Sequence, residues 1–139
     1  MTEMSLQTPT QEADDYWIYA ERKTGKYPEH TVHGGKWLIF VSHDRIDRMW
    51  TKIKTATEEG RLGGMAKAAT AKVNPSFPNS KVKVICVYTY NWKDEPDVTR
   101  IREELRKIGI THKISYKTDE DTLQGKYRKT VSRLSKYYQ

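Results

Sequence analysis

Hydrophobic and polar positions alternate along the chain with two different periods, and these periods predict five strands and two helices. Runs dense in β-branched and aromatic residues predict strands at residues 16–19, 36–41, 82–89 and 112–117. A stretch of small residues at 65–73 predicts one more strand. Apolar side chains recur at helical spacing over residues 44–60 and 94–109, which predicts the two helices.

The ends of these elements carry signals of their own. Ser42 and Asp44 are residue types that cap helix N-termini, so we expect the first helix to begin directly behind them. Pro96 suits the first turn of the second helix, and Gly109 suits its end. The strand at 82–89 is apolar on both faces at its centre, which predicts a central, covered strand. The element order predicts an α/β domain of the α+β type, with a mostly antiparallel sheet backed by two or three helices.

Charge divides the chain into three parts. Residues 1–15 hold four acidic residues and no lysine or arginine, which predicts a flexible acidic tail. Residues 16–127 form the expected folded domain, and residues 128–139 are a basic segment. We favour a helix at this end that docks on the sheet; a flexible tail with nonspecific affinity for RNA or DNA is the alternative. The apolar side chains at helical spacing in that region are Tyr127, Val131, Leu134 and Tyr138.

The formal net charge of +7 bears on the partners. Because acidic residues gather in 1–15, the rest of the chain is more basic than the whole. A basic domain favours polyanionic partners such as nucleic acid, nucleotides or phosphopeptides. An equally good interpretation is a surface rich in exposed lysine from a salt-adapted or heat-adapted cell.

Composition also argues against several kinds of site. The single cysteine, Cys86, allows no disulfide within the chain and no cysteine-based zinc site, and its place in a central strand indicates a buried, inert thiol. No apolar run approaches the roughly 20 residues of a membrane helix, and no signal pattern opens the sequence. We therefore expect a cytoplasmic protein without membrane contact. His30 and His33 lie among proline and glycine, as in a loop, so we expect no metal site and no cofactor.

Several phrases of the sequence, taken together, resemble the basophilic leukaemia expressed protein family, whose biochemical role is poorly defined. The resemblance covers roughly residues 16–127. The phrases are GKWLIFV at 35–41, WTKI with EEGRLG within 50–63, VICVYT at 84–89, DVTRIREELRKIG at 97–109 and ISYKTDEDT at 114–122.

That family in turn is similar to the cap-binding translation initiation factors. The resemblance implies an eIF4e-like fold, in which a curved antiparallel sheet backed by helices holds ligands at its concave face. By position, it places Tyr27 and Tyr88 as stacking aromatics and Lys72 near the phosphate contacts, with Lys67 as a looser candidate. Lys67 and Lys72 have opposite parity, so one regular strand cannot aim both at one ligand.

The chain departs from the cap-binding pattern in one segment. The stretch that carries the second stacking tryptophan and its neighbouring glutamate has no room between Gly60 and Met65. We therefore expect a smaller phosphate-binding or nucleotide-binding pocket rather than recognition of a methylated cap.

The remaining tryptophans and cations differ in the expected elements that carry them. Trp17, Trp37 and Trp50 fall on strand or helix faces and are expected in the core. Trp92 lies in a loop and is the tryptophan that we expect to be exposed and functional. Charged residues alternate along the second helix, which indicates a solvated face; they are Arg100, Arg102, Glu103, Glu104 and Arg106.

Our leading hypothesis is a noncatalytic module that binds a nucleotide or a phosphate-bearing piece of RNA on the concave sheet. Its expected site consists of Tyr27, Tyr88 and Trp92 as stacking aromatics and Lys36, Lys67, Lys72 and Lys117 as phosphate contacts. One alternative rests on a faint resemblance to phosphothreonine lyases, but Leu38 stands where their general-acid histidine is needed, and leucine donates no proton. The other alternative is a protein–protein adaptor that uses its helical face.

Overall fold

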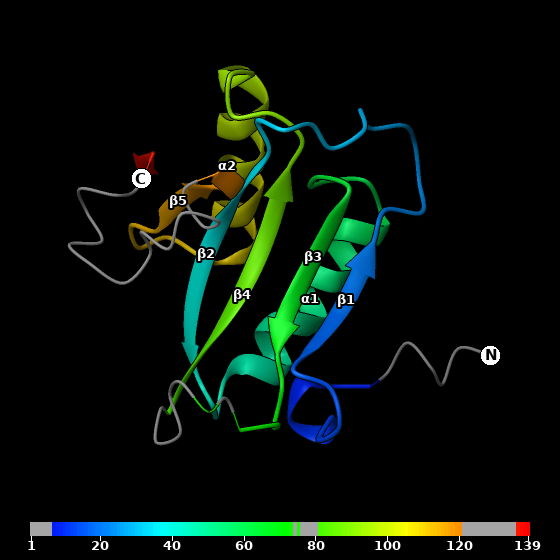
Figure 1. The fold of residues 1–139 in the computed structure, drawn as a ribbon, viewed down its shortest axis with the longest axis vertical. Coiled ribbons are helices and arrows are strands. Elements are labelled where there is room, and N and C mark those ends of the chain that lie inside the picture. Colours follow the sequence, from blue (N-terminus) through cyan, green and yellow to red (C-terminus); the bar gives the residue numbers. More distant parts are fainter. Residues whose placement is uncertain (1–6, 74, 76–80, 121–135) are drawn as a thin grey trace.

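The computed structural model describes residues 7–73, 75, 81–120 and 136–139. Within these residues the chain forms one antiparallel sheet of six strands in the order β1-β3-β4-β2-β5-β6 (Figure 1). The strands are β1 (Trp17–Glu21), β2 (Gly35–Ser42), β3 (Met65–Ala69), β4 (Val82–Thr89), β5 (Ser115–Thr118) and β6 (Tyr137–Tyr138). The predicted α+β fold with a curved antiparallel sheet is confirmed.

Two helices cover one face of this sheet. Helix α1 (Ile46–Glu58) lies behind β1 and β3, and helix α2 (Glu95–Ile108) lies towards β2 and β5 (Figure 1). The hydrophobic core fills the space between the helices and the sheet, and its largest side chains include Trp37 of β2 and Trp50 of α1. The opposite face of the sheet carries no helix from the described part of the chain.

The strand predicted at 82–89 has the bounds of β4 and lies centrally, between β3 and β2. Its side chains Ile85 and Val87 are buried under the helices. On the other face Cys86, at the centre of the strand, is also buried, whereas Val84 and Tyr88 on either side of it are partly buried. The strand is therefore central, as predicted, and its second face is fully buried only at the strand centre.

The two helix starts differ in how well their signals work. The side chain of Asp94 caps α2 by accepting from the backbone N of Asp97 at 3.2 Å, and Gly109 ends the helix with φ of 122°. Helix α1 has no side-chain cap, and its N-cap residue is Arg45, so the predicted caps Ser42 and Asp44 are wrong. The backbone N of His43 donates to the carbonyl of Lys81, which directly precedes β4, at 2.9 Å. This hydrogen bond continues the β2–β4 pairing past Ser42, where a helix cap is expected.

Arg102 corrects the expectation of a fully solvated face on α2. Its side chain is 0% exposed. The guanidinium donates to the backbone oxygens of Gln139 at 2.8 Å, Ile110 at 3.0 Å and His112 at 2.8 Å. The arginine thereby joins α2 to the α2–β5 connection and to the residue that follows β6. Strand β5 begins at Ser115, three residues after the predicted start at residue 112. The carbonyls of Ile110 and His112, which accept from Arg102, lie before this start.

The described residues near the two ends of the chain contact the rest of the domain. A short 3-10 turn, η2 (Pro9–Gln11), packs on α1, where the backbone N of Thr10 donates to Asp47 Oδ1 at 3.0 Å. At the other end, Tyr138 belongs to β6 and not to a helix. The other residues of the predicted C-terminal helix, Tyr127, Val131 and Leu134, lie outside the described residues.

Helices in the described segments are too short or too polar to cross a membrane. The connection between α1 and β3 spans residues 59–64, so the structure also has the short link that the sequence indicates at this point.

Candidate functional site

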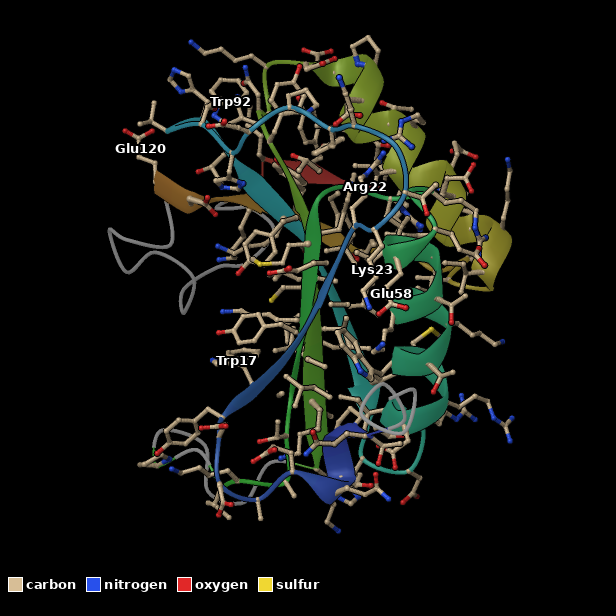
Figure 2. All side chains as sticks on the ribbon, turned by 90° about the vertical axis from the view of Figure 1, so that its right-hand side faces the viewer. Trp17, Arg22, Lys23, Glu58, Trp92 and Glu120 are labelled. Carbon is tan, nitrogen blue, oxygen red and sulfur yellow. The ribbon has the colours of Figure 1, made fainter. Side chains whose placement is uncertain are left out.

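The sheet face away from the helices gathers lysine and aromatic side chains. Side chains alternate between the two faces of a strand, so Lys36 and Leu38 point away from the core side chain Trp37. The same alternation puts Trp17 opposite Ile18, and Figure 2 shows Trp17 projecting from β1 on the side of the sheet that faces away from α1. We call this side the open face.

Three lysines from three strands meet on the open face around Tyr88 and Trp17. Lys36 of β2 lies directly opposite Tyr88 of β4 on one side and opposite Lys117 of β5 on the other. Lys67 of β3 lies opposite Cys86, one row further along the strands. The Nζ atom of Lys67 is 3.9 Å from the centre of the Trp17 ring and 5.9 Å from that of Tyr88. We call these five residues, Trp17, Lys36, Lys67, Tyr88 and Lys117, the lysine–aromatic cluster.

One carboxylate approaches this cluster from the end of β5. Asp119 Oδ1 accepts from Lys36 Nζ at 3.2 Å, and Asp119 Oδ2 contacts His30 Nε2. The backbone N of Asp119 donates to the carbonyl of Gly34 at 2.9 Å, which fixes the position of this residue beside β2. With three ammonium groups and this one carboxylate, the cluster and Asp119 together keep a positive excess that favours an anionic ligand.

Burial adds a desolvation cost to the positive charge of the cluster. Lys36 is 8% exposed and Lys117 is 2% exposed. Partial burial, together with the charge of Lys36, lowers the pKa of Lys67, although Cys86 and Asp119 act in the opposite direction. An anion bound between these lysines would offset the desolvation and the mutual repulsion of the ammonium groups.

A hollow of about 250 Å³ adjoins the cluster at the upper end of β4. Its walls include Tyr27, His30, Met65 and Tyr88. The His30 ring meets the Tyr88 ring edge-on at a centre-to-centre distance of 5.9 Å. Burial raises the pKa of the Tyr88 phenol above its usual range, so this group is a neutral hydroxyl at physiological pH. The hollow therefore offers aromatic and neutral polar surface beside the lysines.

Tyr27 lines this hollow and is held firmly from the helix side. Its hydroxyl donates to Asp97 Oδ2 and accepts from the backbone N of Tyr90 at 3.2 Å. The guanidinium of Arg22 lies 4.9 Å from the centre of its ring. Burial, followed by the contact with Asp97, raises the pKa of Tyr27 above its usual range. Tyr27 therefore stands at the border of the site with its polar end already occupied.

Two of the candidate residues lie apart from the cluster. Lys72 donates to the backbone oxygen of Asp14 at 3.0 Å and lies 4.4 Å from the Tyr16 ring, beyond the end of β3. Trp92 is partly buried and packs against the core, with Lys136 Nζ 3.9 Å from its ring centre. The structure thus brings together Lys36, Lys67, Tyr88 and Lys117 and places Tyr27 beside them, whereas the contacts of Lys72 and Trp92 are with other groups.

Sequence reasoning missed three residues of this site. Trp17 was assigned to the core, although its parity relative to Ile18 and Ala20, both on the core side, is the signal that could have placed it on the open face. His30 and Asp119 carry no such signal. They meet because β5 pairs with β2, and this pairing joins residues far apart in the sequence.

Three further residues lie where the sequence predicts them. Cys86 is buried, as predicted, and burial raises the pKa of its thiol to about 11. Trp37 and Trp50 are core residues, as predicted. No group of three or more histidine, cysteine, aspartate or glutamate side chains in the described segments has an arrangement that could hold a metal ion.

Comparison with known proteins places the fold and the family. Schistosome eIF4E, in a crystal structure with m7GpppA and 4E-BP, superposes with a TM-score of 0.59 at 17% identity, over 77% of this chain and 59% of that one. The complex of C. elegans eIF4E-3 with the 4E-binding protein Mextli and cap analog gives a TM-score of 0.56 at 20% identity, over 78% and 58%. The chain therefore has an eIF4E-like fold and spans under two thirds of the length of these solved chains.

The family is shown by the sequence itself. Residues 8–123 match the pattern of the family described as Basophilic leukemia-expressed protein Bles03. This range contains β1 to β5, both helices and all five residues of the lysine–aromatic cluster. The protein is therefore a member of the Bles03 family, built on an eIF4E-like fold.

Proposed function

We propose that this protein is a noncatalytic binding module that holds a nucleotide, or a phosphate-bearing stretch of RNA, on its open face. The lysine–aromatic cluster is the observation that carries the proposal. It combines three ammonium groups, which attract phosphate oxygens, with two aromatic rings, which can stack on a base. Support also comes from the two solved eIF4E structures, whose ligands are m7GpppA and a cap analog.

In this proposal the phosphates lie over the row formed by Lys36 and Lys117, with Lys67 reaching in from β3. The base stacks on Tyr88 or Trp17, each worth about 1–3 kcal/mol per stacked base. Asp119 holds Lys36 in place and is the group that an incoming phosphate displaces or shares. A bound phosphate would act against the burial that lowers the pKa of Lys67, because a nearby negative charge favours the ammonium form.

Recognition of a methylated cap is not part of the proposal. A cationic base held between two aromatic planes needs a second plane and a carboxylate, and residues 59–64 are too few to supply that segment. The site should therefore accept nucleotides without preference for the 7-methyl group. This expectation separates the chain from the cap-bound structures that share its fold.

The test measures the binding of GTP, m7GTP and a short oligouridylate by calorimetry or fluorescence at two salt concentrations. We expect similar affinity for the methylated and unmethylated nucleotides. Binding of the oligouridylate should weaken with a log–log salt slope of about −2, since three lysines on single-stranded RNA give roughly −0.7 each. If the folded protein binds none of these ligands at low salt, the proposal is wrong.

Variants locate the site. Lys67→Met removes the ammonium and keeps an apolar stem, and Tyr88→Leu removes the ring; each should weaken binding about tenfold or more. Lys72→Met is the matched comparison, because it also removes one lysine charge at the end of the same strand. We expect less than about a twofold effect from it, given its contacts with Asp14 and Tyr16. A loss with Lys72→Met and none with Lys67→Met would move the site to the end of β3.

A further inference from the structure

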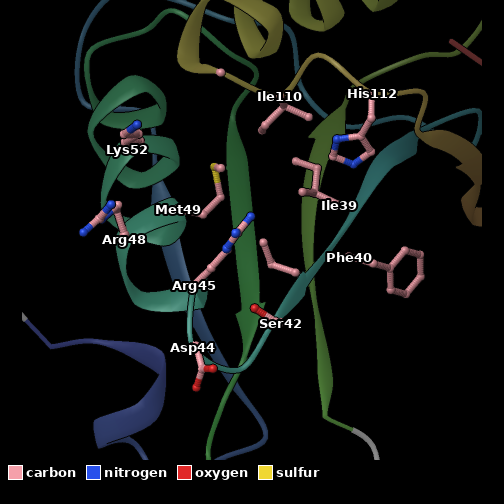
Figure 3. Close-up of a pocket in the computed structure, with 12 residues that line it drawn as sticks. Ile39, Phe40, Ser42, Asp44, Arg45, Arg48, Met49, Lys52, Ile110 and His112 are labelled. Carbon is pink, nitrogen blue, oxygen red and sulfur yellow. The ribbon is translucent and has the colours of Figure 1, made fainter.

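A groove of about 920 Å³ lies at the lower edge of the sheet, apart from the lysine–aromatic cluster. One wall is the first half of α1, the other is β2, and the connection that follows α2 closes the upper end (Figure 3). The floor is apolar and includes Ile39, Val41, Met49 and Ile110. An exposed apolar groove of this kind is typical of a surface that binds another protein.

The groove opens onto a stretch of the β2 edge that pairs with no strand among the described residues. β2 pairs with β5 only over Gly35 to Leu38, so its second half has β4 on one side and no described strand on the other. The four consecutive residues 39–42 all line the groove, although their side chains alternate between faces. Their backbone edge must therefore face the groove, and Figure 3 shows the Phe40 side chain pointing away from α1.

The hydrogen-bond pattern identifies the peptide groups at this edge. The backbone N of Asp119 donates to the Gly34 carbonyl, which shows that even-numbered residues of β2 direct their N–H and C=O groups towards β5. By this alternation the N–H and C=O groups of Phe40 point to the same side of β2 as β5. The pairing with β5 ends at Leu38, opposite Ser115, so β5 does not reach Phe40. Phe40 is also 56% exposed. An edge with these groups is a template for a further strand.

The rim of the groove is basic. Arg45, Arg48 and Lys52 line it from α1, and each is exposed. Within the described residues no carboxylate forms an ion pair with any of these three cations, whereas Lys54 on the same helix pairs with Glu58 at 2.6 Å. The acidic residue among the lining residues is Asp44. This charge excess, at the N-terminal end of a helix, fits an acidic occupant.

We propose that the groove binds an extended acidic segment of a partner protein, which adds a strand to the edge of β2 at Phe40. Its backbone pairs with the Phe40 peptide groups, an apolar side chain enters the floor beside Met49, and its carboxylates meet Arg45, Arg48 and Lys52. Residues 121–135 of this chain are a poor fit as occupant, because they hold four basic residues and one acidic residue.

The test uses two synthetic peptides of about seven residues, one alternating glutamate with valine and one alternating lysine with valine, followed by NMR of the 15N-labelled full chain. We expect the acidic peptide to shift the amide signals of Phe40 and Met49 and to slow hydrogen exchange at Phe40, and we expect the basic peptide to do neither. Arg48→Glu should weaken the acidic peptide roughly threefold to tenfold, since an exposed attraction becomes a repulsion. Lys26→Glu, an equal charge reversal in the exposed loop after β1, should leave the affinity unchanged.

Several results would overturn the proposal. Shifts that appear at Lys67 and Tyr88 and not at Phe40 would assign the peptide to the open face. Exchange protection of the Phe40 amide before any peptide is added, with no response to peptide, would show that the edge is already occupied within the chain. An oligouridylate that shifts Phe40 and Met49 while the acidic peptide does not would make the groove a nucleic-acid site.

Discussion

Replacing Arg102 with methionine is expected to lower the free energy of unfolding by about 2–4 kcal/mol. The guanidinium donates three hydrogen bonds to backbone carbonyls, and a bond with one charged partner contributes roughly 1.5–3 kcal/mol. The gross loss is therefore about 4.5–9 kcal/mol. It is offset in part because methionine avoids the cost of burying a charge, which is several kcal/mol. Burial lowers the pKa of Arg102, which agrees with such a cost.

The measurement is urea denaturation followed by tryptophan fluorescence and circular dichroism at neutral pH. Arg102→Lys keeps the charge but has one donor group in place of a planar fork, so it should recover only part of the loss. Arg106→Met is the matched control one turn later on α2. Arg106 forms an ion pair with Glu103 at 3.3 Å, which is worth less than about 1 kcal/mol at an exposed site.

The reasoning also predicts where the damage falls. Arg102 holds the carbonyls of Ile110, His112 and Gln139, so its removal should first expose the amides of β5 and β6 to hydrogen exchange. The β1–β3 side of the sheet should keep its protection. A loss of under about 1 kcal/mol, with β6 still protected, would refute the estimate and would mean that water replaces the guanidinium at no cost.

Three further changes follow from contacts near the site. Tyr27→Phe removes the hydroxyl that donates to Asp97 and should cost about 1–2 kcal/mol in chemical denaturation, leaving the ring in place. Gly63→Ala puts a methyl group against a backbone carbonyl of β4 and should cost about 1–3 kcal/mol, whereas Gly64→Ala, with an ordinary contact at 3.5 Å, should cost less in the same assay. Burial lowers the pKa of Lys67, so the folded state binds fewer protons than the unfolded state as pH rises towards the usual value of 10.5. Native stability relative to Lys67→Met should therefore increase between neutral pH and pH 10 in thermal melts, and a constant difference would contradict the shift.

Local signals in the sequence were enough for the elements whose ends depend on neighbouring residues. Asp94, Pro96 and Gly109 act within one turn of α2, and each is found in the role that its type predicts. The predicted bounds of β4 match the structure because its β-forming residues run from Val82 to Thr89 without a turn residue. Ser42 failed as a cap because a tertiary contact, the β2–β4 ladder, extends past it to His43.

The candidate site shows the same division. The sequence predicts the three lysines of the cluster as ligand contacts, and the structure places them on one face. Lys72 lies beyond the end of β3, so its separation from Lys67 does not depend on strand parity. Asp119 and Trp17 were not identified, since the first depends on the pairing of β5 with β2 and the second on which face the helices cover. Arg102 was assigned to a solvated face because its charge outweighed its position on the buried stripe. Long-range register and the choice of covered face are therefore the facts that one sequence leaves open.

The part of the β2 edge that no described strand pairs with also bears on how the protein behaves in concentrated solution. An exposed edge with an aromatic side chain such as Phe40 invites identical edges to pair and chains to aggregate. Two copies meeting at this edge would bring Arg45, Arg48 and Lys52 of one molecule against the same three cations of the other. Like charges repel, so these cations oppose self-association at low ionic strength. Added salt screens that repulsion, and colloidal stability of the purified protein is expected to fall as the salt concentration rises.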